Sequence, residues 1–221
     1  MVVMAVAVTL MALLMPAMSQ VRENTHRIVC STNQRQIGQG IFAYAADNRD
    51  RLPASEVLHT SDPNPQELMA TRCNITQGHP LGWDGLGLLY FHSYCGTASC
   101  YYCPSHHGNH PYERYESQWQ TTGNTTALIY SNFHYCGDID WNTGDRRSLH
   151  TDGYGLALIT DGLRTAQDFN HRTGMNVVRG DGSVRWRDDI EGIVAQLPAN
   201  EHDHPGPGYK TMWNNEIEDF D

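Results

Sequence analysis

The chain has 221 residues, of which 39% are apolar and 18% charged, enough for one domain with a hydrophobic core and an appendage. Its formal net charge is −10 at pH 7, and its 15 Lys and Arg residues are scattered along the sequence. A surface that binds nucleic acid needs clustered basic residues. The composition therefore argues against nucleic acid as a partner.

The first segment, residues 1–18 (MVVMAVAVTLMALLMPAM), contains no charged side chain. A helix that crosses a bilayer needs about 20 apolar residues, whereas Pro16 follows after fifteen. A cleaved signal peptide is a second interpretation, although the basic residues that usually precede its apolar stretch are missing. A helix buried in the core is a third. We favour a membrane anchor that contacts the lipid bilayer, because the following sequence continues without a strong helix breaker.

Residues 19–47 have the pattern of an amphipathic helix. Asn48–Asp50 and Pro53 predict its end. The sequence therefore predicts one helix of about 45 residues, bent near Pro16, whose first part is the anchor. Its apolar face is formed by residues that recur at three-, four- and seven-residue steps, with Cys30 and Gln34 off that line: Val21, Ile28, Ile37, Ile41, Tyr44 and Ala45.

Residues 48–197 are expected to form an exported α+β domain, and 198–221 an extended acidic tail. Strands are predicted over 127–136 and 155–160 from their aromatic and β-branched residues. Residues 174–187 predict a hairpin that turns at Asp181-Gly182. An apolar stretch over 86–90 is expected to pack on the long helix. The predicted architecture is thus a long N-terminal helix packed on a small antiparallel β-sheet with long loops.

Six cysteines suit an oxidising compartment, but six permit 15 pairings, and the sequence does not choose among them. Disulfides, a zinc site and buried free thiols all remain open, and we favour disulfides. The densest group of zinc-type ligands is Cys100, Cys103, His106 and His107. The candidates for disulfides are Cys30, Cys73, Cys95, Cys100, Cys103 and Cys136.

A calcium loop is the only cofactor site that the acidic residues suggest. Asp138, Asp140, Asn142 and Asp145 alternate around Gly144, as oxygen ligands do in such loops. The bidentate Glu expected farther along is missing, so we favour a plain acidic turn and no cofactor.

Two regions of the chain resemble a known family. Arg22-Glu23, Cys30, Asn33, Gln36-Ile37, Tyr44, Asp47 and Leu52-Pro53 resemble the N-terminal helix of bacterial type II secretion pseudopilins, most closely the pilin-like proteins of planctomycetes. Cys103-Pro104-Ser105 continues the likeness. His171 followed by nine residues and then Asp181-Gly182 is similar to the H-X9-DG region of the same proteins.

The resemblance implies a non-enzymatic, methylated, prepilin-like subunit of the bacterial inner membrane. Its domain would lie in the periplasm or at the cell surface, and its partners would be other pilin-like subunits and the secretion machinery of a type II or type IV pilin-like filament. The leader with a Gly-Phe-Thr-Leu-Ile-Glu-like motif, where prepilin peptidase cuts such proteins, is absent from the sequence. We expect a misassigned start codon or a fragment.

Other functions remain open. One is an exported metal-binding or hydrolytic domain that carries a pilin-like anchor, and another is a surface module that does not polymerise. His171 and Asp181 could orient an imidazole for base catalysis. No nucleophile motif accompanies them, so we interpret them, with Gly182, as a structural motif that joins a loop to a hairpin.

Overall fold

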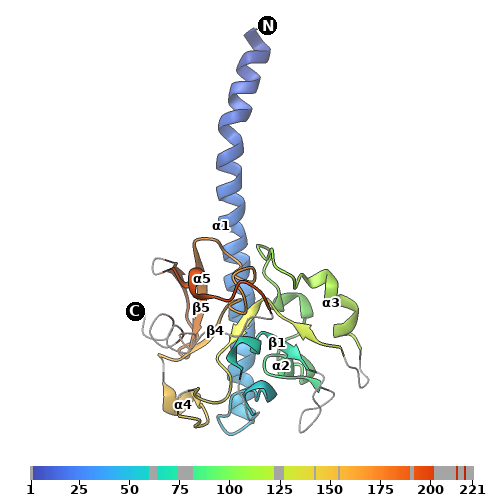
Figure 1. Ribbon diagram of the computed structural model, residues 1–221, viewed down its shortest axis with the longest axis vertical. Helices are drawn as coiled ribbons and strands as arrows, with labels where there is room; N and C mark the ends of the chain where they lie inside the picture. The colour runs from blue at the N-terminus through green and yellow to red at the C-terminus, as the bar shows by residue number, and fades with distance from the viewer. Residues whose placement is uncertain are drawn as a thin grey trace.

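The computed structural model describes residues 2–59, 64–73, 82–121, 127–141, 143–153, 155–189 and 192–201, together with Trp213 and Ile217. One long helix, α1 (Val2–Asp47), dominates the fold. Its second half packs into a group of short helices and two small antiparallel sheets, and its first half projects from them as a rod (Figure 1). The predicted α+β class with a long N-terminal helix is confirmed.

The buried face of α1 follows a regular helical spacing through Cys30, Gln34, Ile37, Ile41 and Ala45, each at most 1% exposed. The helix ends after Asp47, as predicted, and the next residues include two with positive φ, Arg49 and Asp50.

The apolar face predicted for the N-terminal part of this segment was wrong. Val21 and Ile28 are 65% and 67% exposed, whereas Cys30 and Gln34 are fully buried. The hydrophobic pattern did not identify Cys30 and Gln34 as buried residues, because hydrogen bonds to Asp161 hold both side chains in the interior.

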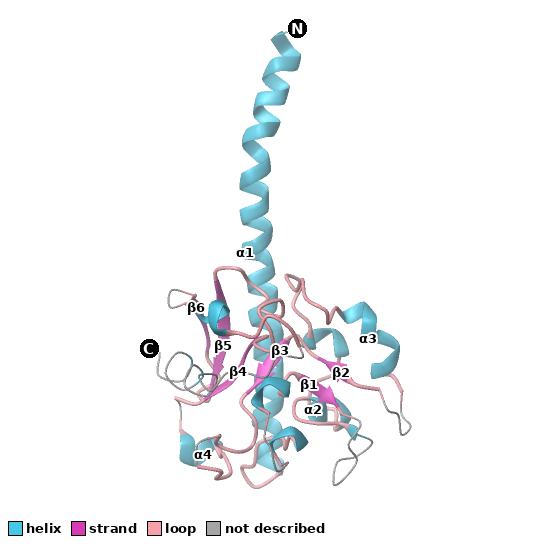
Figure 2. Cartoon of the chain, viewed as in Figure 1, coloured by secondary structure: helices cyan, strands magenta, loops and turns pink. Residues whose placement is uncertain are grey.

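The larger sheet has the strand order β3 (Phe133–Tyr135), β4 (Ala157–Asp161), β5 (Gly174–Arg179) and β6 (Val184–Asp188), all antiparallel (Figure 2). α1 lies against β4, β5 and β6. A Cβ atom at Gly38 would lie 3.0 Å from Cγ1 of Val178 on β5, so the glycine allows the helix to approach the sheet closely. All six residues of β5 are buried.

Residues 127–136 do not form the single strand that was predicted. Ile129–Tyr130 is β2, which pairs with β1 (Ala70–Arg72) in a separate two-stranded sheet, whereas β3 joins the larger sheet. The chain changes sheets at Ser131 and Asn132. The Ser131 hydroxyl donates to the Phe133 carbonyl, and the Asn132 side chain donates to the His110 carbonyl. These two polar side chains bond to loop and strand-end carbonyls, an arrangement that hydrophobic patterning does not reveal.

The predicted hairpin is present as β5 and β6, which pair from Gly174↔Asp188 to Val178↔Val184. Its turn is longer than a two-residue turn, since the Arg179 amide donates to the Ser183 carbonyl at 2.9 Å. Gly182 takes a positive φ of 80°, and Asp181 does not share it. The strand predicted over 155–160 corresponds to β4.

Short helices surround the sheets. The predicted apolar stretch is α2 (Gly87–Phe91), which contacts α1 as expected. Within the described residues, the remaining elements are η1 (Glu56–Leu58), η2 (Pro65–Glu67), η4 (Ala98–Tyr101), α3 (Tyr112–Trp119), α4 (Leu149–Asp152) and α5 (Ile193–Gln196).

Two residues of the predicted C-terminal tail are described beyond residue 201, and both are fully buried. The Trp213 ring lies 5.0 Å from that of Trp141 and 5.5 Å from that of His134, measured between centroids. At Trp213 and Ile217 the chain therefore lies against the core instead of extending into solvent, because both side chains are strongly apolar. The other residues of 202–221 lie outside the described residues.

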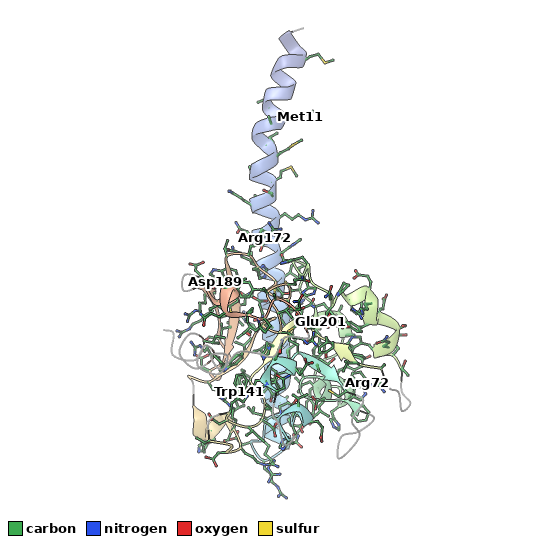
Figure 3. All side chains as sticks on the ribbon, viewed as in Figure 1. Met11, Arg72, Trp141, Arg172, Asp189 and Glu201 are labelled. Carbon is green, nitrogen blue, oxygen red and sulfur yellow. The ribbon has the colours of Figure 1, made fainter. Side chains whose placement is uncertain are left out.

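The projecting half of α1 carries apolar side chains that no other part of the described chain covers. Met11, Leu14, Met15 and Met18 are 61%, 59%, 71% and 71% exposed, and Met11 lies on the rod well away from the sheets (Figure 3). No helix within the described ranges combines enough length with enough apolar character to cross a bilayer.

Candidate functional site

Four buried side chains with metal-ligating atoms meet where α1 enters the globular part. Cys30 comes from α1, Cys103 follows η4, Asp161 ends β4, and His171 lies in the loop between β4 and β5. Their ligand atoms all lie within 4.8 Å of one another. We refer to these four residues as the junction cluster.

Two close contacts within the junction cluster join unlike groups. Cys30 Sγ lies 3.1 Å from Asp161 Oδ1, and Cys103 Sγ lies 3.6 Å from His171 Nε2. The other ring nitrogen of His171, Nδ1, lies 2.6 Å from Oε1 of Glu23 on α1. His171 is thus held between a carboxylate on one side and a thiol on the other.

Asp161 is fixed by several donors. Its Oδ1 accepts hydrogen bonds from the side-chain amides of Gln34 (3.2 Å) and Asn170 (3.0 Å), and its Oδ2 accepts from the backbone amide of Asn176 (2.7 Å). The orientation of the Asp161 carboxylate is therefore set by α1, the β4–β5 loop and β5 together.

A second layer of contacts surrounds Glu23. Its Oε2 accepts a hydrogen bond from the Ser105 hydroxyl at 2.8 Å, and Arg27 lies one helical turn away, 3.8 Å from Oε1. The Arg27 guanidinium stacks 3.9 Å above the Trp186 ring on β6, and that ring meets His171 edge to face. This layer closes the outer side of the junction cluster.

The environment shifts the pKa values of these groups in opposite directions. Burial raises the pKa of Cys30 well above its ordinary value, and the neighbouring Cys103 adds to the effect. Burial also acts to raise the pKa of Cys103, but hydrogen bonds with Cys30 and His171 bring it below its ordinary value.

The pKa values of His171 and Glu23, which are in contact, shift in opposite directions. Burial disfavours the charged imidazole, yet Cys103, Asp161 and Glu23 together raise the pKa of His171 to about 9. Burial opposes ionisation of Glu23, and the contacts with His171 and Ser105 lower its pKa. The contacts among Cys103, His171 and Glu23 thus lower the pKa of the thiol and of the carboxyl group and raise the pKa of the imidazole between them.

This arrangement has three chemical capabilities. The four groups can bind one metal ion. The two cysteines can form a disulfide that joins α1 to the segment after η4. Cys103, His171 and Glu23 also have the order of nucleophile, base and orienting carboxylate, and Cys103 lines a hollow of about 440 Å³ together with Val29, Asn33 and His106.

The structure does not bring the predicted zinc ligands together. Cys100 Sγ lies beside Cys95 Sγ at 2.8 Å, the His106 ring contacts Asn170, and His107 is exposed and contacts the Ser105 carbonyl. Only Cys103 of that set belongs to the junction cluster. Sequence proximity suggested ligands that the fold directs to different places.

Among the described residues, the predicted calcium ligands do not form a cluster of metal-binding atoms. Asp138 is buried and accepts from the Ser55 amide and His59. Asp140 accepts from the Thr143 amide and lies 3.6 Å from Arg147. The backbone carbonyl of Asp145 accepts from the Asp140 amide, and Asn142 lies outside the described residues. These contacts are those of an acidic turn.

His171 and Asp181 do not bond to each other as interpreted from the sequence. His171 contacts Glu23 and Cys103, whereas Asp181 is exposed and its Oδ1 accepts from the Ser183 amide within the hairpin turn. The motif residues thus have separate roles. His171 belongs to the junction cluster, and Asp181 with Gly182 shapes the turn.

All six cysteines are described, all are buried, and none is in a disulfide. Cys95 and Cys100 lie side by side, and Cys30 and Cys103 meet in the junction cluster. The Cys73 thiol lies 3.7 Å from an Asp84 oxygen, and the Cys136 thiol contacts the Gly137 carbonyl.

Sequence reasoning missed Glu23, Cys30 and Asp161 as parts of one site with His171. Cys30 and Asp161 are separated by 131 residues, and no spacing rule for metal ligands covers such a distance. A signal was nevertheless present, since Glu23, Cys30, Cys103 and His171 are all among the residues on which the expected likeness to pilin-like proteins was based.

Comparison with known proteins adds no relative. No protein-family model matches the chain, and neither a curated protein nor a solved structure shows significant similarity to it.

Proposed function

We propose that this protein is a non-enzymatic, pseudopilin-type subunit. The apolar first part of α1 anchors it in the bacterial inner membrane and packs with the same helix of other copies. The globular part then lies on the periplasmic side or at the cell surface, where the secretion machinery can move a filament of such subunits.

The observation that carries the proposal is the division of α1 into two halves with different surroundings. The second half is the spine on which the larger sheet packs, whereas the first half projects from the globular part (Figure 1). On this projecting half, Met11, Leu14, Met15 and Met18 are exposed. Residues 2–18 have no charged side chain and, as part of α1, reach about 26 Å, close to the thickness of about 30 Å of a bilayer core. Lipid is a suitable environment for such a surface.

Contact between copies is supported by the middle of the helix. Val21, Ile28 and Val29 are 65%, 67% and 42% exposed, although they lie beyond the uncharged segment and next to the globular part. Exposed apolar residues at these positions extend the apolar surface of α1 toward the domain. A second copy's helix would bury them, as subunits do in a helical filament.

Membrane extraction tests the anchor. The full chain, expressed in a bacterium, should remain in the membrane pellet after an alkaline wash. Met11→Lys with Leu14→Lys should release it, because each charge is costly in lipid, about 3 kcal/mol. The matched control, Gln20→Lys with Asn24→Lys, changes two exposed polar positions of the same helix and should stay in the pellet. Release of the unsubstituted chain by the wash would contradict the proposal.

Crosslinking tests the contact between copies. A cysteine at position 21 (Val21→Cys) should give dimers on mild oxidation in membranes. The control Arg185→Cys, on the exposed side of β6, should not. Monomers in both cases would refute assembly through α1 and leave a surface module that does not polymerise.

A further inference from the structure

We propose that Cys30, Cys103, Asp161 and His171 bind one Zn²⁺ ion that fastens α1 to the globular part. This site is independent of the proposed membrane role.

The spacing of the four ligand atoms suits a tetrahedral ion. With metal–ligand distances of about 2.0–2.3 Å, neighbouring ligand atoms of a tetrahedral zinc site lie about 3.3–3.8 Å apart. The Cys30–Asp161 and Cys103–His171 separations are 3.1 and 3.6 Å, and no pair in the junction cluster exceeds 4.8 Å. Side-chain adjustments on the order of 1 Å would place all four around one centre.

The donor types select the metal. Two thiolates, an imidazole and one carboxylate form the mixed sulfur, nitrogen and oxygen set that zinc accepts. Calcium and magnesium prefer sites built from oxygen ligands alone. Because four protein groups complete a tetrahedron and all four are buried, the site has the closed form of a structural zinc centre.

The surrounding contacts prepare the ligands. Glu23 bonds to His171 Nδ1 and leaves Nε2 directed toward Cys103. A carboxylate that orients a histidine in this way is a regular companion of zinc sites. Asp161 is likewise held by Gln34, Asn170 and the Asn176 amide. The ligands are therefore positioned by the fold before an ion binds.

A bound ion would change the charge of the cluster. Thiolate and carboxylate ligands balance the charge of a divalent ion such as zinc. Binding would require the thiols of Cys30 and Cys103 to lose their protons to solvent, as metal binding by cysteine generally does.

Two other uses of the junction cluster are conceivable, a disulfide and a nucleophilic cysteine, but each would involve only two of its four residues. A disulfide between Cys30 and Cys103 leaves the approach of Asp161 and His171 unexplained. A nucleophilic Cys103 with His171 as base leaves the approach of Cys30 and Asp161 unexplained. Zinc binding uses all four groups.

Metal analysis of the purified full chain is the direct test. We expect about one equivalent of zinc per chain, since structural zinc binds tightly enough to co-purify. Cys103→Ser and His171→Gln should each reduce the zinc content about tenfold or more. Cys73→Ser and Cys136→Ser remove buried thiols outside the cluster and should retain the full equivalent.

The unsubstituted chain provides a second measurement that does not depend on the folding of variants. Removal of zinc with a chelator should lower the melting temperature, and zinc but not calcium should restore it. Cobalt in place of zinc should show the absorption of a tetrahedral site with thiolate ligands.

Three results would overturn the inference. One is a full chain that carries no zinc and takes up none. Another is a peptide map in which Cys30 and Cys103 are joined as a disulfide. A third is rapid alkylation of Cys103 at the same rate with and without added zinc, which would indicate a free nucleophile.

Discussion

The Nδ1 atom of His171 lies 2.6 Å from Oε1 of Glu23, although the two residues are 148 positions apart in the sequence. The contact joins the loop after β4 to α1 at the point where the projecting half of the helix begins, and Arg172 beside it lies at the same junction (Figure 3). Farther along, α1 is held mainly by apolar contacts through Ile37 and Ile41. At its entry to the globular part, polar groups hold it instead.

Glu23→Gln should weaken zinc binding about 10- to 100-fold, because an amide orients His171 less strongly than a carboxylate does. The matched control is Arg22→Gln, which changes the neighbouring, exposed position of α1. Competition with a chromophoric zinc chelator measures both affinities. Equal affinities for the two variants would mean that Glu23 does not support the metal site.

Gly87→Ala should destabilise the protein by about 3 kcal/mol or more, because the added Cβ would lie 1.8 Å from the Thr71 carbonyl oxygen. That oxygen belongs to β1, so relief of the clash requires α2 and the small sheet to separate. Gly96→Ala is the control, since a Cβ there has no neighbour within 4 Å. Thermal unfolding should show a large loss for the first variant and almost none for the second.

Arg164→Lys should cost about 1–3 kcal/mol. The buried Arg164 guanidinium bonds to Glu67 at 3.0 Å and to Glu201 at 2.9 Å, and it lies over the Tyr130 ring. A lysine ammonium cannot reproduce the fork that reaches both carboxylates. Arg172→Lys, at an exposed position, should leave the free energy of unfolding in urea unchanged. A similar small effect for both variants would contradict this role.

Acid should destabilise the fold through buried histidines. Burial lowers the pKa of His134 from 6.5 to about 3 and that of His110 to about 4. Because both pKa values are depressed in the folded state, the unfolded chain takes up protons first as the pH falls below 6.5. The free energy of unfolding should therefore decrease from about pH 7 to about pH 4, by up to about 1.4 kcal/mol per pH unit for each histidine.

Substitution isolates this contribution from other titrating groups. His134→Gln should reduce the dependence of the melting temperature on pH, whereas His107→Gln, at an exposed position, should not. An unchanged pH dependence in the His134 variant would show that this histidine becomes protonated without cost in the folded state.

Mild oxidation should join Cys95 to Cys100. Their sulfur atoms are 2.8 Å apart, and the hydrogen bond with Cys100 lowers the pKa of Cys95 to about 7, so that a thiolate is available near neutral pH. Peptide mapping after oxidation should recover this pair and leave Cys73 and Cys136 as thiols. A Cys100–Cys103 bridge in the map would disagree with the structure.

The sequence predicted the parts of the fold that depend on regular patterns. The uninterrupted run from Val2 to Asp47 lacks a strong breaker after Pro16, and it is one helix. The hairpin around Gly182 was likewise evident, because alternating apolar residues flank a glycine that can take a positive φ. Both features are local, so neighbouring residues are sufficient to specify them.

Features that depend on distant partners were not predictable in this way. Cys30 and Gln34 were placed off the apolar face, yet they are buried because Asp161 accepts their hydrogen bonds. The strand over 127–136 was predicted as one, and it divides because Ser131 and Asn132 bond to neighbouring carbonyls instead. In each case a polar side chain is buried by a partner that sequence patterning does not identify.

The residues of the candidate site were even harder to predict from the sequence, because their partners are also distant. His171 and Cys103 were each singled out, the first by a motif and the second by a group of nearby cysteines and histidines. Their shared site emerged only from the fold, which also adds Glu23, Cys30 and Asp161. Ligands from four separate segments leave no characteristic spacing in the sequence.

The most direct test of the central claim is photo-crosslinking from position 11 of the full chain in living bacteria. A photoreactive residue in place of Met11 should crosslink to lipid or to a second copy of the chain, while the same residue in place of Arg185 should do neither. Crosslinks from position 11 only to the chain's own globular part, or a product from which residues 1–18 have been removed, would contradict the account.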